Sequence, residues 1–306
     1  MEDIIVLTLH RAMVAGTPLL LATTGEVICE RSGILNLGIE GVMAIGAVVA
    51  FIVTMTTGQP WLGVFAAIAA GMAFSIIHAF ASITLQANQV VSGLALTMLG
   101  LGLSGMLGKP YVGKPLSIKM EDLVIPWLSD IPWLGKILFT QGPFFYLAII
   151  LAFASWFFLE RTRLGIQIRS TGENPKAAEA QGVSVSRLRY LSVIIGGGFS
   201  ALAGAHLSIS YSKSWIEGMT AGRGWIAIAL TIFALWNPGR AIWAAFLFGG
   251  FFVVQYLLQP LGISPSFLAM LPYIATLFIL LLISLKDPRK LNAPAMLAEP
   301  YKRGER

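Results

Sequence analysis

The sequence has little charge and few of the side chains that catalytic or metal sites commonly use. Only 12% of its 306 residues are Asp, Glu, Lys or Arg, against roughly 25% in an ordinary soluble domain. Its single cysteine, Cys29, excludes an internal disulfide. Three scattered histidines add no spacing typical of a metal site, so we expect neither a metal nor a cofactor.

Several catalytic motifs are also missing. No Gly-x4-Gly-Lys-Ser/Thr loop occurs, so the chain should not bind ATP, and no Gly-x-Ser-x-Gly or His-Glu-x-x-His motif occurs. Gly100, Gly102 and Gly105 match a dinucleotide fingerprint formally, but they lie in an apolar stretch, where small residues favour helix packing. His78 and His206, each alone in an apolar stretch, are more typical of packed or pore-side polar residues than of catalysts. We therefore expect no enzyme.

The chain has long apolar stretches in place of charge. Hydrophobic residues make up 56% of it, and residues 41–108 and 241–285 contain no Asp, Glu, Lys or Arg. Each stretch is long enough for two or more membrane spans of about 20 residues. The sequence predicts an all-α, polytopic membrane helical bundle in one domain, residues 1–306, with eight or ten spans as alternatives to nine. The nine predicted spans are 3–25, 37–57, 61–84, 88–107, 143–160, 188–211, 222–237, 240–259 and 267–285.

The distribution of basic residues predicts the orientation. Residues 160–189 carry six basic and three acidic residues, and so does the tail 286–306. An excess of Lys and Arg marks cytoplasmic segments, so both are assigned to the cytoplasm. Residues 109–142 then lie outside, where Trp127 and Trp133 suggest a compact loop with a short interfacial helix. The acidic amino terminus is also expected outside, without a cleavable signal peptide.

Helix-boundary residues stand in the middle of the polar loop 160–189. Asn174 is a favoured N-cap, Pro175 suits the first helical position and Gly182 suits the position just past the end. They predict a two-turn helix over 175–181, or, as the plain alternative, a capped surface turn. A helix this short needs a partner or a scaffold. Its small surface would come from Ala177, Ala178 and Ala180, with Lys176 and Glu179 in water.

Residues 26–41 combine glycines and charges between two apolar runs. The glycines are Gly33, Gly38 and Gly41, and the charged residues are Glu26, Glu30, Arg31 and Glu40. Such a segment cannot be a continuous lipid-facing helix, so we predict a broken helix. We expect a cytoplasmic turn over 26–32. For 36–41 two interpretations stay open: Asn36, Gly38, Glu40 and Gly41 line a cavity, or Glu40 is only a favourable acid in the first turn of the next helix.

Three further polar or aromatic residues are candidates for the translocation path. Asn88 and Gln89 open a predicted span and could face a solute, although Asn88 fits a helix cap better. Trp225 could stack on a sugar or base at an outer gate beside Arg223, or both could be interfacial anchors.

Four stretches together resemble the permease subunits of ATP-binding-cassette (ABC) importers of the branched-chain amino acid and simple-sugar superfamily, most closely the nucleoside type. They are Gly33-Ile-Leu-Asn-Leu-Gly-Ile-Glu-Gly41, Asn88-Gln-Val-Val-Ser-Gly93, Thr162 to Gly204 with Thr171-Gly-Glu-Asn-Pro-Lys-Ala-Ala-Glu-Ala-Gln-Gly-Val183, and Gly222-Arg-Gly-Trp-Ile-Ala-Ile-Ala-Leu230 followed by Trp236-Asn-Pro238. Ribose-type relatives usually have Asp at the position of Asn36, a Gly-rich turn at Asn237 to Arg240, and an additional first span.

The resemblance implies a role for the short helix and a set of partners. In such permeases this helix docks into a groove on a separate ATPase subunit. The implied coupling residues are Glu173, Asn174, Pro175, Lys176, Ala177, Ala178, Glu179, Ala180, Gln181 and Gly182. The implied partners are that ATPase, a second, homologous permease subunit and an extracytoplasmic solute-binding protein, and the implied location is a bacterial-type inner membrane.

The expected function is translocation of nucleosides or related simple sugars by alternating access. A branched-chain amino acid permease of the same superfamily is the nearer alternative. An ion-coupled secondary transporter is a different class, and the two charge-free runs argue against it, because ion coupling generally leaves ionisable groups at membrane depth. The net charge of +6 comes from loops and tail, where orientation explains it better than nucleic-acid binding does.

Overall fold

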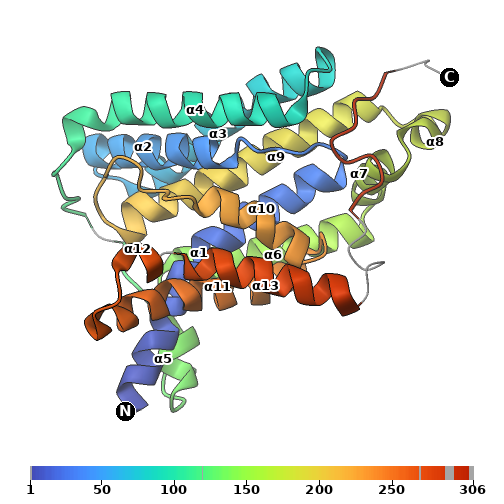
Figure 1. The fold of residues 1–306 in the computed structure, drawn as a ribbon. Helices are drawn as coiled ribbons and strands as arrows, with labels where there is room; N and C mark the ends of the chain where they lie inside the picture. Colours follow the sequence, from blue (N-terminus) through green and yellow to red (C-terminus); the bar gives the residue numbers. More distant parts are fainter. Residues whose placement is uncertain (1, 119, 269, 287–292, 303–306) are drawn as a thin grey trace.

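The computed structural model describes residues 2–118, 120–268, 270–286 and 293–302, and most of them are helical. Long helices lie side by side in Figure 1, with α7 and α8 at the right-hand end of the bundle. The α-helices are α1 (Glu2–Arg31), α2 (Ile39–Thr57), α3 (Pro60–Ala79), α4 (Gln89–Gly108), α5 (Leu134–Leu138), α6 (Pro143–Arg161), α7 (Arg163–Glu173), α8 (Pro175–Ala180), α9 (Val185–Ala205), α10 (Arg223–Phe233), α11 (Pro238–Leu258), α12 (Pro265–Leu268) and α13 (Leu271–Lys286).

Short elements extend or connect these helices. Two π-helices continue α3 and α9, namely η1 (Phe80–Thr84) and η3 (His206–Tyr211). The 3-10 turns are η2 (Lys109–Tyr111) and η4 (Gln259–Leu261), and the two-residue strands β1 (Leu123–Val124) and β2 (Thr140–Gln141) pair antiparallel. Below, the α8 end means the end of the bundle that holds α7 and α8, and the α5 end means the end that holds residues 109–142.

Among the described residues, seven helices are long and apolar enough to cross a membrane. They cover 4–31, 39–57, 60–84, 89–111, 143–161, 185–211 and 238–258. The predicted span 222–237 contains α10, which has only 11 residues and a length of about 16 Å, roughly half of the bilayer core. The predicted span 267–285 corresponds to α12 and the 16-residue α13. The all-α membrane bundle is confirmed, and the predicted nine apolar segments are roughly consistent with it.

Helix α1 is longer than the sequence predicts. It continues through Arg31, so the expected turn over 26–32 is wrong for residues 26–31. Glu26 and Glu30 are each only 1% exposed, because the protein interior supplies their hydrogen-bond partners. The break in the helix is confirmed, but it covers only residues 32–38.

A second interruption separates η3 from α10, over residues 212–222. Figure 1 shows the chain before α2 running back from the α8 end between other helices, and the chain before α10 entering from the opposite end. Two helices, α2 and α10, thus begin inside the bundle instead of at its surface. Discontinuous helices of this kind commonly form the solute and ion sites of transporters.

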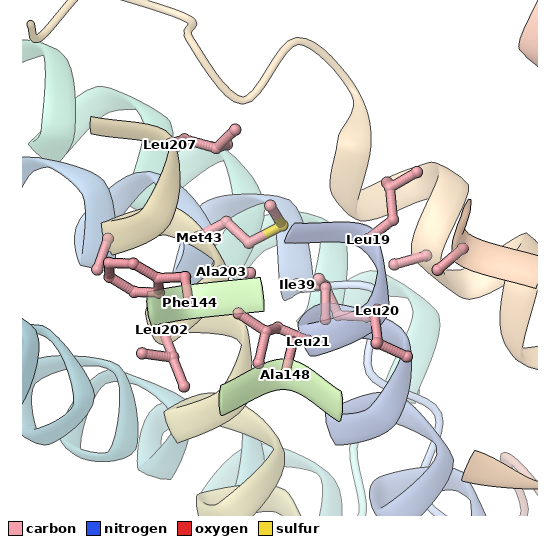
Figure 2. Close-up of a cluster of buried hydrophobic side chains, with 14 of the residues drawn as sticks. Leu19, Leu20, Leu21, Ile39, Met43, Phe144, Ala148, Leu202, Ala203 and Leu207 are labelled. Atoms are coloured by element: carbon pink, nitrogen blue, oxygen red, sulfur yellow. The ribbon is translucent and has the colours of Figure 1, made fainter. Parts of the chain in front are cut away.

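The hydrophobic core joins α1, α2, α6 and α9. Leu19, Leu20 and Leu21 of α1 meet Ile39 and Met43 of α2 in Figure 2, with side chains of α6 and α9 beside them. The labelled residues are Phe144 and Ala148 of α6, Leu202 and Ala203 of α9, and Leu207 of η3. Because this cluster includes the first turn of α2, it fixes where that helix begins.

Small residues let α2 and α4 approach closely. A Cβ atom added to Gly100 would lie 2.5 Å from the carbonyl oxygen of Gly41, whereas one added to Gly102 would meet no atom within 4 Å. The helix-packing interpretation of the formal fingerprint is therefore confirmed at Gly100 and does not extend to Gly102.

Residues 109–142 form the compact loop with a short helix that the sequence predicts. The helix is α5, and Trp127 and Trp133 are 87% and 59% exposed, as interfacial side chains would be in the absence of lipid. His10 Nδ1 lies 2.9 Å from the carbonyl oxygen of Lys136, so this polar residue of α1 bonds the loop instead of facing lipid.

Candidate functional site

Helix α8 has the boundaries that the sequence predicts to within one residue. The Asn174 side chain accepts a hydrogen bond from the amide of Ala177 at 3.0 Å. At the other end Gly182, with φ +81°, donates to the carbonyl of Glu179 at 2.9 Å, and Val183 donates to that of Ala178 at 3.1 Å. These two bonds form a Schellman motif, in which a left-handed residue closes the helix. The sequence prediction of a capped two-turn helix is confirmed.

One side of α8 is anchored and the other is exposed. Pro175 and Ala178 are buried, and Val183 packs against a cluster that includes Val27 of α1 and Leu159 of α6. The exposed side presents Lys176, Ala177, Ala180, Gln181 and Gly182. The scaffold that a six-residue helix requires is thus the bundle itself, and the helix offers a surface of small side chains.

The carboxyl-terminal tail lies across the α8 end. The amide of Met296 donates to the carbonyl of Gly172 at 2.9 Å, and that of Ala298 donates to the carbonyl of Gly33 at 3.2 Å. The Tyr301 hydroxyl donates to the Glu179 carboxylate. Glu179 is therefore half-buried, whereas the sequence predicts that it lies in water. The tail therefore connects α7 and α8 to the start of the first break. It lies at the same end of the bundle as the polar loop 160–189, as the excess of Lys and Arg in both segments predicts. Residues 287–292 and 303–306 of the predicted tail lie outside the described residues.

The buried acids of α1 hold two other segments. Glu26 Oε1 accepts a hydrogen bond from the amide of Asn36 at 3.1 Å, inside the first break. Glu30 accepts one from the indole Nε1 of Trp236, which has a left-handed φ of +53° between α10 and α11. Both carboxylates thus fix irregular backbone near the α8 end.

Side chains from α3 and α4 satisfy the unwound backbone of residues 32–38. The amide of Leu35 donates to Gln89 Oε1 at 2.8 Å, and its carbonyl oxygen lies 3.2 Å from His78 Nε2. The Thr97 hydroxyl donates to the carbonyl of Leu37 at 2.9 Å. Asn36 Oδ1 accepts from the amide of Gly38 at 2.9 Å. Since a buried backbone group without a partner is costly, these bonds allow the break to exist inside the bundle.

The starts of α2 and α10 meet at Glu40. Its two carboxylate oxygens accept hydrogen bonds from the amides of Gly222 and Gly224, at 2.8 Å and 2.6 Å, and its side chain is 4% exposed. A Cβ atom on Gly224 would lie 2.6 Å from the amide nitrogen of Glu40, so the close approach requires glycine there. We call Glu40, Gly222 and Gly224 the junction. Glu40 is both a first-turn acid of α2 and a ligand for the first turn of α10.

The predicted path residues fall into two groups. Asn36, Gly38, Glu40, Gly41 and Gln89 come together, but they are buried and hold backbone instead of facing open space. Asn88 is exposed and caps α4 by accepting from the amide of Val91 at 3.1 Å, which confirms the cap interpretation. Trp225 is partly exposed and follows the junction directly.

Sequence reasoning missed the partners of these residues. It placed Glu40 and Gly222 in separate motifs without connecting them, and it gave no role to Trp236 or Tyr301. A local signal existed only for the glycines, which mark positions where backbones approach closely. The hydrogen bonds of Glu40, Trp236 and Tyr301 join residues far apart in the chain, so no local pattern indicates them.

Comparison with known proteins finds a matching family and several similar proteins that cover most of the chain. Residues 8–283 match the family described as "Branched-chain amino acid transport system / permease component". The chain is 40% identical to the "Putative glucose ABC transporter permease protein TsgC13" of Haloferax volcanii, over 96% of this chain and 97% of that protein. It is 39% identical to the "Guanosine ABC transporter permease protein NupQ" of Bacillus subtilis, over 96% of each. It is 34% identical to the "Nucleoside ABC transporter permease protein NupC" of Lactococcus lactis, over 88% of this chain and 90% of that protein.

Proposed function

The chain belongs to the permease-component family of branched-chain amino acid transport systems, as a multi-pass membrane subunit of an ABC importer, and we propose that it translocates nucleosides or related simple sugars. The ATPase activity belongs to a separate subunit, because this sequence contains no nucleotide-binding loop. The names of the relatives support the solute class: they are described as glucose, guanosine and nucleoside permeases.

The observation that carries the proposed mechanism is the exposed side of α8. Its outward side holds Ala177, Ala180 and Gly182, flanked by Lys176 and Gln181. Its Schellman end and buried Pro175 and Ala178 hold it in place. A flat, small-residue helix suits insertion into a groove of a partner protein. We assign Glu173 to Gly182 as the contact with the ATPase, which puts the α8 end in the cytoplasm.

A second permease subunit is part of the proposal. The Bacillus subtilis guanosine permease NupP is 25% identical to this chain, over 76% of this chain and 69% of that protein, in the organism that also has NupQ. Two permeases of one solute in one organism favour a heterodimer in which this chain takes the NupQ-like position. A solute-binding protein completes the importer by delivering solute to the α5 end.

The junction and its neighbours are the proposed moving part. Buried Gln89 and Asn36 bond the unwound backbone at Leu35 and Gly38, and Gly41 packs against α4. Glu40 ties α2 to α10. Asn88 and Trp225, which keep exposed surface, are the members of the predicted path that remain available to a solute. Alternating access would then move α2 and α10 together.

The test is uptake by the complete importer. Cells that express this chain with its ATPase, its second permease and its binding protein are given labelled guanosine, glucose or leucine. We expect ATP-dependent uptake of guanosine or glucose, whereas uptake of leucine alone would contradict the proposed solute class.

Ala180, on the exposed side of α8, tests the coupling role in the same cells. Ala180→Arg should abolish uptake while the protein still inserts, and Ala180→Ser, which keeps the small surface, should retain it. Equal uptake by both variants would exclude α8 as the coupling contact.

A further inference from the structure

A cavity of about 540 Å³ opens near the α5 end, and Glu40, Gly222 and Gly224 are not among its lining residues. It lies among α1, the start of α6, η3 and the end of α11. Six lining residues matter here: Asp122, Gln141, His206, Ser210, Tyr211 and Lys213. Its volume falls within the range of roughly 300 to 1,000 Å³ that small-molecule sites occupy.

Gln141 lines this cavity, and no group of the described residues uses the acceptor oxygen of its side chain. Its side chain is fully buried, and its amide nitrogen donates to the carbonyls of Ile137 and His10, at 2.7 Å and 3.4 Å. Two carbonyl acceptors fix the amide orientation, because only the nitrogen can donate to them. Gln141 Oε1 is then left without a hydrogen-bond partner. A buried acceptor of this kind calls for a donor from outside the protein.

His206 supplies a second such atom. Its side chain is 3% exposed, and its ring packs edge-on against Phe144 with centroids 5.2 Å apart. Its Nδ1 has no hydrogen-bond partner in the part of the chain that the structure describes. His206 is the first residue of η3, a π-helix. Single π-helical turns inside α-helices occur frequently at functional sites, because they redirect side chains. Two residues from different elements, each with a buried polar atom that has no partner among the described residues, therefore line one cavity.

Other lining groups have complementary chemistry. The glycine at 142 leaves open the space beside two oxygen atoms, since a Cβ atom there would lie 3.5 Å from Asp122 Oδ1 and 3.8 Å from Ser210 Oγ. Lys213 brings a cation, and the rings of Phe144 and Tyr211 bring apolar faces. The cavity thus combines acceptors, a donor and aromatic surface, which together suit a ring that carries several hydroxyl groups.

We propose that this cavity is an entry site for a polyhydroxylated solute, such as the ribose of a nucleoside or a hexose, within one permease subunit. The inference rests on the proposed function and names a site for its solute. Solute hydroxyls donate to Gln141 Oε1 and Asp122, accept from Lys213, and share a proton with His206 Nδ1, while the sugar or base lies on the aromatic faces. Arg223, between the two glycines of the junction, stands over the Tyr211 ring at 5.7 Å, so the site adjoins the start of α10.

The test compares uptake kinetics of cavity variants in the assembled importer, reconstituted in proteoliposomes with its ATPase and binding protein, with labelled guanosine and glucose as probes. Gln141→Met and His206→Phe each remove one unpartnered atom at similar volume. Thr54→Val is the matched control, because Thr54 Oγ1 is also buried and unpartnered but Thr54 does not line the cavity. Gly142→Val adds bulk beside Asp122 and Ser210.

We expect KM for the carried solute to rise about tenfold in Gln141→Met and His206→Phe, the effect of about one lost hydrogen bond. Gly142→Val should raise KM at least as much, and Thr54→Val should leave it unchanged. Unchanged KM in the three cavity variants would overturn the proposal, as would a co-purified phospholipid that Gly142→Val displaces without a change in KM. If the wild-type importer carries neither probe, the proposed function fails; if it carries one and the variants match it, only the site fails.

Discussion

The carboxylate of Glu40 on α2 accepts a hydrogen bond of 2.6 Å from the amide of Gly224 on α10, 184 residues later in the chain. Gly222 donates to the other oxygen of the same carboxylate at 2.8 Å. One side chain therefore satisfies two of the amides that the start of α10 leaves without helical partners. The two interrupted segments of the fold are fastened to each other at this point.

Replacing Glu40 should separate the two segments. Glu40→Ala leaves two buried amides unpaired, and because hydrogen bonds to a charged group contribute about 1.5–3 kcal/mol each, we expect a loss of a few kcal/mol in stability. Glu40→Gln keeps one acceptor oxygen and should lose less. The midpoint of thermal unfolding in detergent should fall in the order wild type, Glu40→Gln, Glu40→Ala. Equal midpoints for all three would show that these hydrogen bonds contribute no stability.

The Glu30 and Trp236 pair should show coupling. Trp236→Phe removes the indole donor and leaves a buried carboxylate without that partner, so we expect a loss of about 1–3 kcal/mol. In a chain that carries Glu30→Gln, Trp236→Phe should cost less stability, because a buried neutral amide loses less than a buried carboxylate when its hydrogen-bond donor is removed. A double-mutant cycle from unfolding midpoints measures this, and additive single effects would contradict a direct interaction.

Position 182 should require a residue that tolerates a left-handed backbone conformation. Its φ of +81° ends α8, so Gly182→Ala should destabilise that turn by about 1 kcal/mol, and Gly182→Asn by less, because Asn tolerates this conformation better. Hydrogen exchange of the α8 amides reports the difference, together with uptake. Identical exchange in the two variants would argue against the Schellman end as the stabilising feature.

The contact between Gly41 and Gly100 predicts a difference between two neighbouring glycines. Gly100→Ala forces α4 away from α2 and should cost about 1–3 kcal/mol, as overpacking generally does. Gly102→Ala is the matched control on the same helix and should not destabilise, since its Cβ meets open space. The measurement is the unfolding midpoint of each purified variant; a loss at Gly102 equal to that at Gly100 would point to helix propensity instead of packing.

The tail should restrain α8. Tyr301→Phe removes the hydroxyl that bonds Glu179, and a chain ending after residue 292 also removes the bonds of Met296 and Ala298. We expect faster hydrogen exchange in α7 and α8 for Tyr301→Phe and a larger increase for the truncation. A chain ending after residue 302 is the control, because it keeps the described contacts. Unchanged exchange in the truncated chain would refute a restraining role.

Both ends of α8 can be predicted from the sequence because their signals are local. Asn174, Pro175 and Gly182 act on amides and carbonyls within a few residues, so their types indicate both ends of α8 without tertiary information. The apolar runs likewise predict the bundle. Helix α7 was missed, since its polar sequence resembles a loop; its Thr162 cap was the available signal.

The interior could not be predicted in this way. Glu26 and Glu30 appeared to need water, because their partners Asn36 and Trp236 are set by the fold and not by spacing. His206 and Gln141 looked unremarkable, since an unpartnered atom is defined by what the surrounding helices fail to supply. Burial and pairing over long sequence distances are properties of the packed chain.

The junction also has an electrical consequence. A helix start carries about half a positive elementary charge, so two adjacent starts carry about one, which the single negative charge of Glu40 offsets. The buried guanidinium of Arg223, between Gly222 and Gly224, then leaves the junction net positive. A net positive junction has nothing to attract a small cation, and this suits a subunit that must change shape in a membrane under voltage. Sodium or potassium should gain no route between α2 and α10 while the solute passes.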